Sequence, residues 1–484
     1  MERRCSRSSA NPRPSLPEFA LRNGRIRGPN HYRRRVHRFN AETDEMARLC
    51  FEYATERLRM DPVPLDHPQS LADLTAAVGD TITAAGSNPA VVMGWFRDVL
   101  APACISADSP SFLSFIPVAP TKASQLFDVV VSSSAICASD WLEGAGAIYA
   151  ENQALRWVAD LAGMPAEAGG VFVSGGSAGN LSALVAARAT IAERRTRPVR
   201  WRVALADQAH SSLVNTLRIM DVDALTVPTG PDDRLTGPAL RAALDADPDA
   251  GSIFAVVATA GTTNTGTVDD LAAIVDVAHE RGLWVHVDGA YGLAGLAAPS
   301  IRERFAGIEL ADSFVVDPHK WLFAPFDCAA LVYRNPETAR HVHAQMAPYL
   351  DSMRATEEWN PADYAYHLTR RARGLPFWFS LAVHGTDAYR DAVEKTLEIA
   401  RDAARRIDAA PHLELLREPE LTVVLWRRTG WTHDQYYEWS NAMLRDQRAF
   451  VMPTTLHGET ILRAVYLNPE SKPAVTNDII ASLV

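Results

Sequence analysis

The stretch VFVSGGSAGNLSALVAAR, residues 171–188, places a short apolar run directly before a glycine-rich turn and a long alanine- and leucine-rich run. The apolar run predicts a buried strand over residues 171–173, and the second run predicts a helix over residues 180–194. The small residues between them allow close approach of a ligand, and the start of the helix offers free N–H groups and a positive dipole end. The stretch therefore predicts a strand–turn–helix unit that binds an anion such as phosphate.

The same alternation of short apolar runs and longer helical runs continues on the C-terminal side of this stretch. Strands are predicted at 203–206, 254–259, 283–287 and 313–316, and helices at 211–219, 238–245 and 269–281. This order predicts an α/β fold with a mostly parallel sheet and helices on both of its faces.

The segments outside this α/β region suggest four parts in the 484-residue chain. Residues 1–40 are rich in arginine and predict a disordered basic extension, and residues 41–120 are broken by prolines and predict an N-terminal helical segment. Residues 121–376 form the predicted large domain, and residues 377–484 form a predicted small C-terminal α+β domain.

Two features of the later chain refine this division. Residues 335–370 are polar and aromatic with weak periodicity, and they predict a long loop. The small domain is predicted from helices at 387–408 and 435–446 and strands at 421–426 and 460–466.

Composition excludes several classes of protein. No apolar run approaches the 18 or more residues of a membrane-spanning helix, so we expect no membrane partner. Residues 1–38 hold 11 arginines and two glutamates although the whole chain carries a net charge of −10, so the remainder is strongly acidic and nucleic acid is not the expected partner. The five cysteines include no CxxC pair, and their sparse use suits a reducing, cytoplasmic location.

Polar residues follow several of the predicted strands, at the edge of a parallel sheet where ligands usually bind. His210 follows the strand at 203–206, and it is either a structural histidine or a ring that stacks on a planar ligand. Asp288 ends an apolar strand, where its carboxylate either caps a helix or faces a cation such as a protonated ring nitrogen. Lys320 is one of only four lysines, and it is either a surface lysine packed on Trp321 or an amine for reaction with an aldehyde.

Two other interpretations of these residues remain open at this level. The G-x-S-x-G pattern around Ser177 also matches the nucleophile turn of serine hydrolases, with Asp288 and His319 following in the appropriate order. No HGGG-type segment precedes Ser177, which weakens that alternative. His286 and Asp288 share a strand face, but no adequate third ligand lies nearby in sequence, so we expect no metal.

The four polar features described above are more specific together than any one of them alone. A phosphate-binding turn, a stacking histidine, an aspartate for a ring nitrogen and a lysine amine together match the needs of one cofactor, pyridoxal 5'-phosphate.

From about residue 40 to its end, the chain resembles the group II pyridoxal-phosphate-dependent amino-acid decarboxylases, the relatives of aromatic-L-amino-acid and glutamate decarboxylases. The segments that carry this resemblance are FVSGGSAGNLSALVAAR (172–188), DQAHSS (207–212), ATAGTTNTGTVDD (258–270), VHVDGAYG (285–292) and DPHKW (317–321). The resemblance implies fold type I of the pyridoxal-phosphate-dependent transferases. It also implies a homodimer with active sites at the subunit interface, in which residues 41–120 clasp the partner.

The resemblance also implies a role for individual residues. Lys320 would carry the internal aldimine, Asp288 would pair with the pyridine nitrogen, and His210 and Ala290 would cover the two faces of the ring. The implied phosphate ligands are Gly176, Ser177 and Thr263, and the implied catalytic residues are Lys320, Tyr349, His319 and His210.

The expected reaction is decarboxylation of an L-amino acid to the amine and carbon dioxide. Tyr349 would protonate the substrate carbon, whereas relatives with phenylalanine at the matching position make aldehydes, so aldehyde formation and transamination are the alternatives. The residues that resemble the substrate wall are Phe112, Phe115, Ile116 and Pro117. Because this wall is apolar, we expect an aromatic or apolar substrate.

Overall fold

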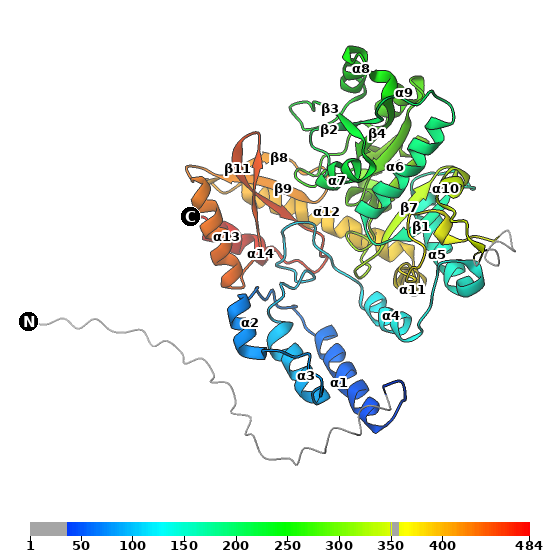
Figure 1. Cartoon of the computed structure of the whole chain (residues 1–484). Coiled ribbons are helices and arrows are strands. Elements are labelled where there is room, and N and C mark those ends of the chain that lie inside the picture. The colour runs from blue at the N-terminus through cyan, green and yellow to red at the C-terminus, as the bar shows by residue number, and fades with distance from the viewer. Residues whose placement is uncertain (1–35, 349, 351–357) are drawn as a thin grey trace, which may run out of the picture.

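The computed structural model describes residues 36–348, 350 and 358–484, and two β-sheets organise this part of the chain (Figure 1). The larger sheet has seven strands in the order β1-β7-β6-β5-β4-β2-β3. Its strands are β1 (Gly169–Val173), β2 (Arg202–Ala206), β3 (Asp223–Val227), β4 (Ile253–Thr259), β5 (Trp284–Asp288), β6 (Ser313–Val316) and β7 (Ala329–Tyr333). Strands β2 to β6 pair in parallel, whereas β7 runs antiparallel to both of its neighbours. The prediction of a mostly parallel α/β sheet is confirmed.

The five strands predicted from apolar runs agree with β1, β2, β4, β5 and β6 to within two residues at each end. Two strands of the larger sheet were not predicted. Strand β3 lies at the sheet edge and keeps most of its side chains exposed, so it has no apolar run. Strand β7 is fully buried, but it is antiparallel and follows β6 without an intervening α-helix, so it falls outside the strand–helix alternation.

Helices cover both faces of the larger sheet. One face packs against α6 (Gly176–Ala192), α7 (Ser211–Met220) and α10 (Pro336–His343). The other face packs against α5 (Trp141–Leu161), α8 (Gly237–Ala246), α9 (Leu271–Glu280), α11 (Leu375–His384) and the first half of α12 (Thr386–Asp408). Helix α10 corrects the prediction of an uninterrupted loop over 335–370. It has only eight residues and presents few apolar side chains to the core, so it leaves no apolar run in the sequence.

The smaller sheet is antiparallel in the order β10-β11-β9-β8. Its strands are β8 (Leu413–Arg417), β9 (Val423–Arg428), β10 (Pro453–Leu456) and β11 (Glu459–Val465). It packs against the second half of α12, α13 (His433–Arg445) and α14 (Pro473–Ser482) in a core of its own. Helix α12 therefore contributes to both cores and lies between the two sheets in Figure 1.

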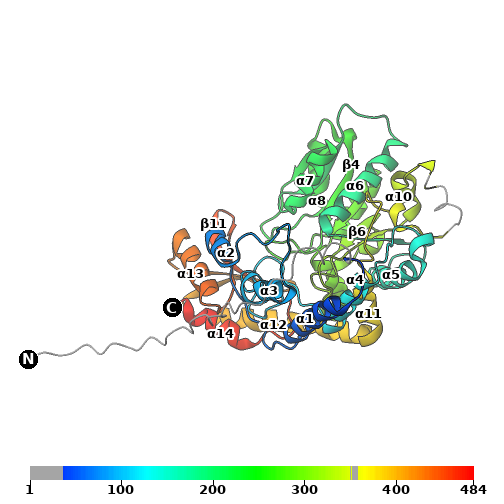
Figure 2. The same cartoon turned by 60° about the horizontal axis from the view of Figure 1, so that its bottom comes forward.

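In Figure 1 the N-terminal helices lie below both sheets, and in Figure 2, where that side comes forward, they lie in front of the body. They are α1 (Ala41–Leu58), α2 (Leu71–Val78), α3 (Pro89–Trp95), which the π-helix η2 (Phe96–Leu100) extends, and α4 (Lys122–Ser133) nearer the body. Asn40 caps α1 by accepting N–H groups of Glu42 and Thr43, as expected at a helix start. Helices α1, α2 and α3 bury no residue in the single chain. No helix among the described residues is long and apolar enough to cross a membrane.

Candidate active site

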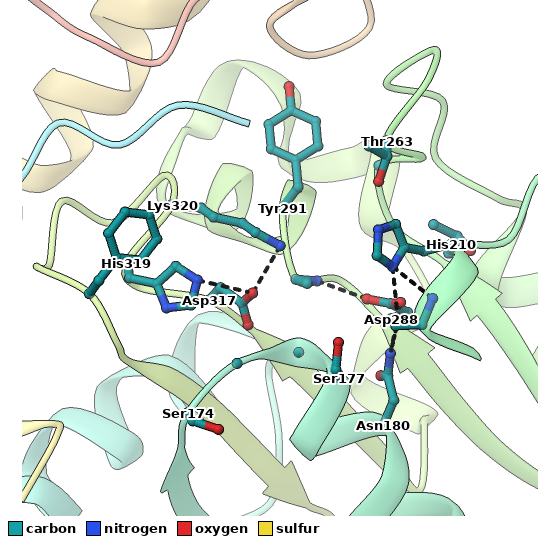
Figure 3. A pocket seen from close by; sticks show the side chains of 17 residues that line it. Ser174, Ser177, Asn180, His210, Thr263, Asp288, Tyr291, Asp317, His319 and Lys320 are labelled. Atoms are coloured by element: carbon teal, nitrogen blue, oxygen red, sulfur yellow. Dashed lines mark hydrogen bonds and ion pairs between the residues drawn. The ribbon is translucent and has the colours of Figure 1, made fainter. Parts of the chain in front are cut away.

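A cavity of about 350 Å³ lies where the parallel strands end and α6 begins (Figure 3). Eight residues singled out from the sequence line it together: Gly176, Ser177, His210, Thr263, Asp288, Ala290, His319 and Lys320. They come from segments up to 144 residues apart, and the topology of the sheet brings them together. Tyr349 lies outside the described residues.

The start of α6 forms one wall of this pocket. Helix α6 begins at Gly176, and no side chain caps its first turn. A Cβ atom on Gly176 would lie only 2.9 Å from Cβ of Ala290 and 3.4 Å from both carboxylate oxygens of Asp317, so the site fits closely around a glycine. Ser177 is exposed beside it. Uncapped N–H groups at the positive end of a helix dipole make this wall suitable for a phosphate group.

Lys320 lies in the turn after β6, on the side of the pocket opposite Asp288 (Figure 3). Its Nζ is 2.9 Å from Oδ2 of Asp317, whose side chain is only 2% exposed. The other carboxylate oxygen of Asp317, Oδ1, is buried and has no hydrogen-bond partner in the described chain. The lysine amine is therefore held by a carboxylate that retains spare capacity to accept a hydrogen bond.

His319 contacts the same carboxylate. Its Nδ1 accepts the backbone N–H of Cys328 at 2.9 Å, so the proton of the neutral ring is on Nε2, which lies 3.5 Å from Oδ2 of Asp317. Burial lowers the pKa of His319, although Asp317 acts in the opposite direction. The ring also lies 5.1 Å from that of Phe326, which lines the same pocket.

Asp288 is fixed at the end of β5 by two donors. Its Oδ2 accepts from Nδ2 of Asn180 at 3.0 Å, and its Oδ1 accepts from the backbone N–H of Ala290 at 3.2 Å. The side chain is almost fully buried, yet it has no ion-pair partner among the described residues. A buried carboxylate held by neutral donors at the edge of a cavity is suited to face a cationic ligand.

The position of His210 is compatible with both roles considered for it, a structural histidine and a ring that stacks on a planar ligand. Its Nδ1 accepts the backbone N–H of Ser212 at 3.2 Å and thereby caps α7. The Ser212 hydroxyl lies 2.9 Å from the same atom. The ring is exposed and lines the pocket, so its face is available to a planar ligand.

The hydrolase alternative is not supported by this arrangement. His319 bonds to Cys328 and faces Asp317, and Asp288 bonds to Asn180 and Ala290. Neither group makes a hydrogen bond to Ser177, so no Ser–His–Asp relay is formed.

The residues present fit pyridoxal phosphate. The start of α6, the carboxylate of Asp288 and the amine of Lys320 match its phosphate, ring nitrogen and aldehyde. In addition, two buried polar atoms of the pocket lining have no partner in the described chain, namely Oγ1 of Thr259 and Oδ1 of Asp317. Buried polar atoms are normally hydrogen-bonded, so these two indicate a polar ligand. The cavity volume lies within the range of small-molecule sites.

The four predicted substrate-wall residues do not line this cavity in the single chain. The ring of Phe112 packs 5.3 Å from that of Phe450, and Phe115 packs 5.8 Å from the same ring while remaining 61% exposed. Ile116 packs against the large core and Pro117 is buried. Their role in substrate binding stays a prediction.

Sequence reasoning missed several residues of potential importance. Asn180 and Phe326 line the pocket, but neither stands at a predicted strand end.

Arg463 interrupts the apolar run of β11, a signal that was available in the sequence. Burial lowers its pKa to about 10, its Nε donates to the carbonyl of Asn264, and its Nη2 has no partner in the described chain. A buried guanidinium with bonding capacity to spare, next to the Thr263 loop, is a candidate for binding a carboxylate.

Comparisons with known proteins point to one family. Residues 75–429 match the family model described as the pyridoxal-dependent decarboxylase conserved domain. An aromatic-L-amino-acid decarboxylase of Bacillus atrophaeus is 29% identical over 81% of this chain and 84% of its own length. An L-2,4-diaminobutyrate decarboxylase of Rhizobium meliloti is 31% identical over 74% of this chain and 73% of its own length. A phenylacetaldehyde synthase of Arabidopsis thaliana is 26% identical over 76% of this chain and 79% of its own length.

The fold also matches solved structures. The Oryza sativa protein TDC, solved with PLP and tryptamine, superposes with a TM-score of 0.85 at 24% identity and covers 93% of this chain and 99% of its own. This likeness supports the type I fold.

Proposed function

Because the chain belongs to the pyridoxal-dependent decarboxylase family and is a carboxy-lyase that uses pyridoxal phosphate, we propose that it converts an aromatic or apolar L-amino acid to its amine and carbon dioxide. The observation that carries this proposal is the convergence of Lys320, Asp288, His210 and the start of α6 on one cavity. The bound cofactor supplies an electron sink for the pair of electrons left when the bond to the carboxylate breaks.

The residues of this chain divide the task of holding that cofactor. Gly176, Ser177 and Thr263 bind its phosphate, together with the N–H groups at the start of α6. Asp288, held by Asn180, keeps a proton on the ring nitrogen. His210 and Ala290 cover the two faces of the ring.

Lys320 would provide the amine that holds the cofactor. Asp317 lies 2.9 Å from that amine and accepts its hydrogen bond when it is free. His319, with its proton on Nε2, faces the same carboxylate at 3.5 Å. The lysine amine therefore lies beside a buried acceptor.

Tyr349 is the proposed donor of the proton that replaces carbon dioxide on the substrate carbon. Formation of an aldehyde is the second candidate function, because a relative of similar coverage is named phenylacetaldehyde synthase. Replacing Tyr349 by phenylalanine distinguishes the two: the aldehyde fraction rises if Tyr349 is the donor, and an unchanged product ratio assigns the proton to another residue.

The proposed side-chain class of the substrate rests on the apolar character of Phe326 and of the predicted wall residues. Phe326 lines the cavity and is 59% exposed, and Phe112, Phe115, Ile116 and Pro117 are proposed to complete the wall. Arg463 is the proposed partner of the substrate carboxylate.

The proposed assembly is a cytoplasmic homodimer with active sites at the interface. The support is that α1, α2 and α3 bury no residue in the single chain, although they expose large apolar side chains such as Phe51 and Leu71. Residues 41–120 would clasp the partner, residues 121–376 would hold the cofactor and residues 377–484 would form the small domain.

The decisive experiment is mass spectrometry of the products after aerobic incubation with pyridoxal phosphate and a panel of L-amino acids. The panel includes aromatic, aliphatic and basic members, since one relative is named for diaminobutyrate. Amines from aromatic or aliphatic members support the proposal. Amine only from a basic member would overturn the substrate class, and aldehyde with ammonia would overturn the reaction type.

A further inference from the structure

A row of buried polar side chains lies beneath α6 and leads to Asp288. Trp284, His286 and Asp288 alternate along β5, so all three project from the same face of the sheet. Ser313 of β6 pairs directly with His286 in the strand ladder. Asn180 reaches the row from α6, so the row combines two strands and a helix.

Four hydrogen bonds join these side chains end to end. Nε1 of Trp284 donates to Oγ of Ser313 at 2.9 Å, and that hydroxyl lies 2.8 Å from Nδ1 of His286. Nε2 of His286 lies 2.9 Å from Oδ1 of Asn180, whose Nδ2 donates to Oδ2 of Asp288 at 3.0 Å. All five side chains are at least 95% buried.

The direction of donation along this row is fixed by its ends. An indole N–H can only donate, so Ser313 accepts from Trp284, and its own hydrogen remains available to Nδ1 of His286. The neutral imidazole then carries its proton on Nε2 and donates to the carbonyl oxygen of Asn180. This direction matches the other end of the row, where the amide nitrogen of Asn180 donates to the carboxylate of Asp288.

A branch of the same network reaches the histidine of the pocket. Nδ2 of Asn180 also lies 3.5 Å from Oγ of Ser212, a long contact, and that hydroxyl lies 2.9 Å from Nδ1 of His210. The amide of Asn180 thus contacts both the carboxylate and the helix turn that carries the stacking ring.

The imidazole of His286 is held in its neutral form. Complete burial lowers its pKa to about 4, although the nearby Asp288 acts in the opposite direction. The ring is therefore neutral at physiological pH, with one donor and one acceptor nitrogen. Both nitrogens are occupied by Ser313 and Asn180, which also leaves neither of them for a metal ion.

We propose that His286 is a positioning residue that fixes the orientation of the Asn180 amide and thereby aims Asp288 at the ring nitrogen of the cofactor. A flipped amide would place the Asn180 oxygen against the carboxylate oxygen, and two acceptors cannot bond. The Nε2–H donor of His286 excludes that flip. This inference rests on the proposed function, because it assigns Asp288 to the ring nitrogen.

The test compares two cofactors on three proteins. The cofactors are pyridoxal phosphate and the analogue in which C–H replaces the ring nitrogen, and the proteins are wild type, His286→Met and His286→Gln. Glutamine retains a donor near the position of Nε2, whereas methionine has a similar length and no donor. The dissociation constant for each cofactor is measured on the cofactor-free protein by quenching of tryptophan fluorescence.

We expect His286→Met to bind pyridoxal phosphate about tenfold more weakly than wild type, with the analogue affected less than about twofold. His286→Gln should restore most of the affinity for pyridoxal phosphate. Ser313→Ala, a smaller change that leaves the imidazole in place, should show a weaker loss with the same selectivity for the natural ring.

Each other outcome has a definite meaning. Equal losses for both cofactors, or no loss for either, would overturn the positioning role of His286. A wild-type protein that binds the two cofactors equally well would show that Asp288 does not contact the ring nitrogen, and it would overturn that part of the proposed function as well.

Discussion

The two sides of the pocket differ in how fully their polar groups are bonded. Around Asp288, each carboxylate oxygen has a donor, and the donor Asn180 is itself held by His286. Around Lys320, the buried Asp317 binds one amine and leaves an oxygen without a partner. The ring-binding side is therefore organised in advance, whereas the lysine side retains the capacity to exchange partners, as an amine that leaves and returns requires.

The largest effect expected from this comparison is at Lys320. Lys320→Ala removes the only amine among the cavity-lining residues and should reduce amine production by about 10³-fold or more. Lys395→Ala is a matched control, because Lys395 is an exposed helix lysine whose one ion-pair partner among the described residues is Glu398, and it should leave the rate unchanged. Substantial turnover by Lys320→Ala would refute the assigned role.

Asp288→Asn should have the next largest effect. The substitution removes the charge that faces the ring nitrogen and turns an amide toward Asn180, so we expect kcat to fall about 10²-fold. The absorption spectrum of the bound cofactor should change with it. An unchanged kcat and spectrum would mean that the organised side of the pocket does not contact the ring.

Asp317→Asn should have a smaller effect, because an amide oxygen still accepts from Lys320. We expect kcat to fall about tenfold while the thermal midpoint of unfolding stays within a few degrees, since the replaced oxygen Oδ1 has no partner to lose. If Asp317→Asn impaired kcat as strongly as Asp288→Asn, the contrast between the two sides would be wrong.

The smallest effect expected is on stability against acid. Burial lowers the pKa of His286 to about 4 from 6.5, so between these values the unfolded chain binds a proton that the folded chain excludes. The free energy of unfolding should therefore fall as the pH drops from 6.5 to 4, by at most about 3 kcal/mol from this group. In His286→Gln this contribution should be absent.

The comparison with His286→Gln is necessary because another buried group acts in the opposite direction. Burial raises the pKa of Asp269 to about 7 from 3.8, so its contribution to stability is present at low pH and is lost as the pH rises through 7. Denaturant unfolding of both proteins at pH 4.5 and 7 isolates the His286 contribution. Equal pH dependence in the two proteins would show that His286 does not remain neutral.

The sequence predicted those elements whose signal is local. Buried parallel strands such as β4 appear as continuous apolar runs, and the polar residues that follow them, such as Asp288 and Lys320, lie at the sheet edge for topological reasons. Strand β3 has no such run because its side chains remain exposed. A strand was therefore predictable where it was buried and also stood within the alternation of strands and helices, a condition that the buried but antiparallel β7 does not meet.

The supporting contacts of the site could not be predicted in the same way. Asn180 was visible within the glycine-rich turn, but its function depends on His286, which lies 106 residues away and meets it only after the sheet and α6 have packed. The contact between Asp317 and Lys320 joins residues only three positions apart, so the sequence comes closer to predicting it. That Oδ1 of Asp317 has no partner depends on the surrounding packing, which the sequence does not show.

Helix α12 has a consequence for how the molecule unfolds. Its first half places Tyr389, Val393 and Leu397 in the core of the larger sheet, and its second half places Ala403 and Ile407 in the core of the smaller one. Loss of either core removes the packing of half of a continuous helix, so the two sheets are expected to melt in one cooperative transition. A fragment that starts at residue 377 would expose the first three of these side chains to water, and it should aggregate rather than fold alone.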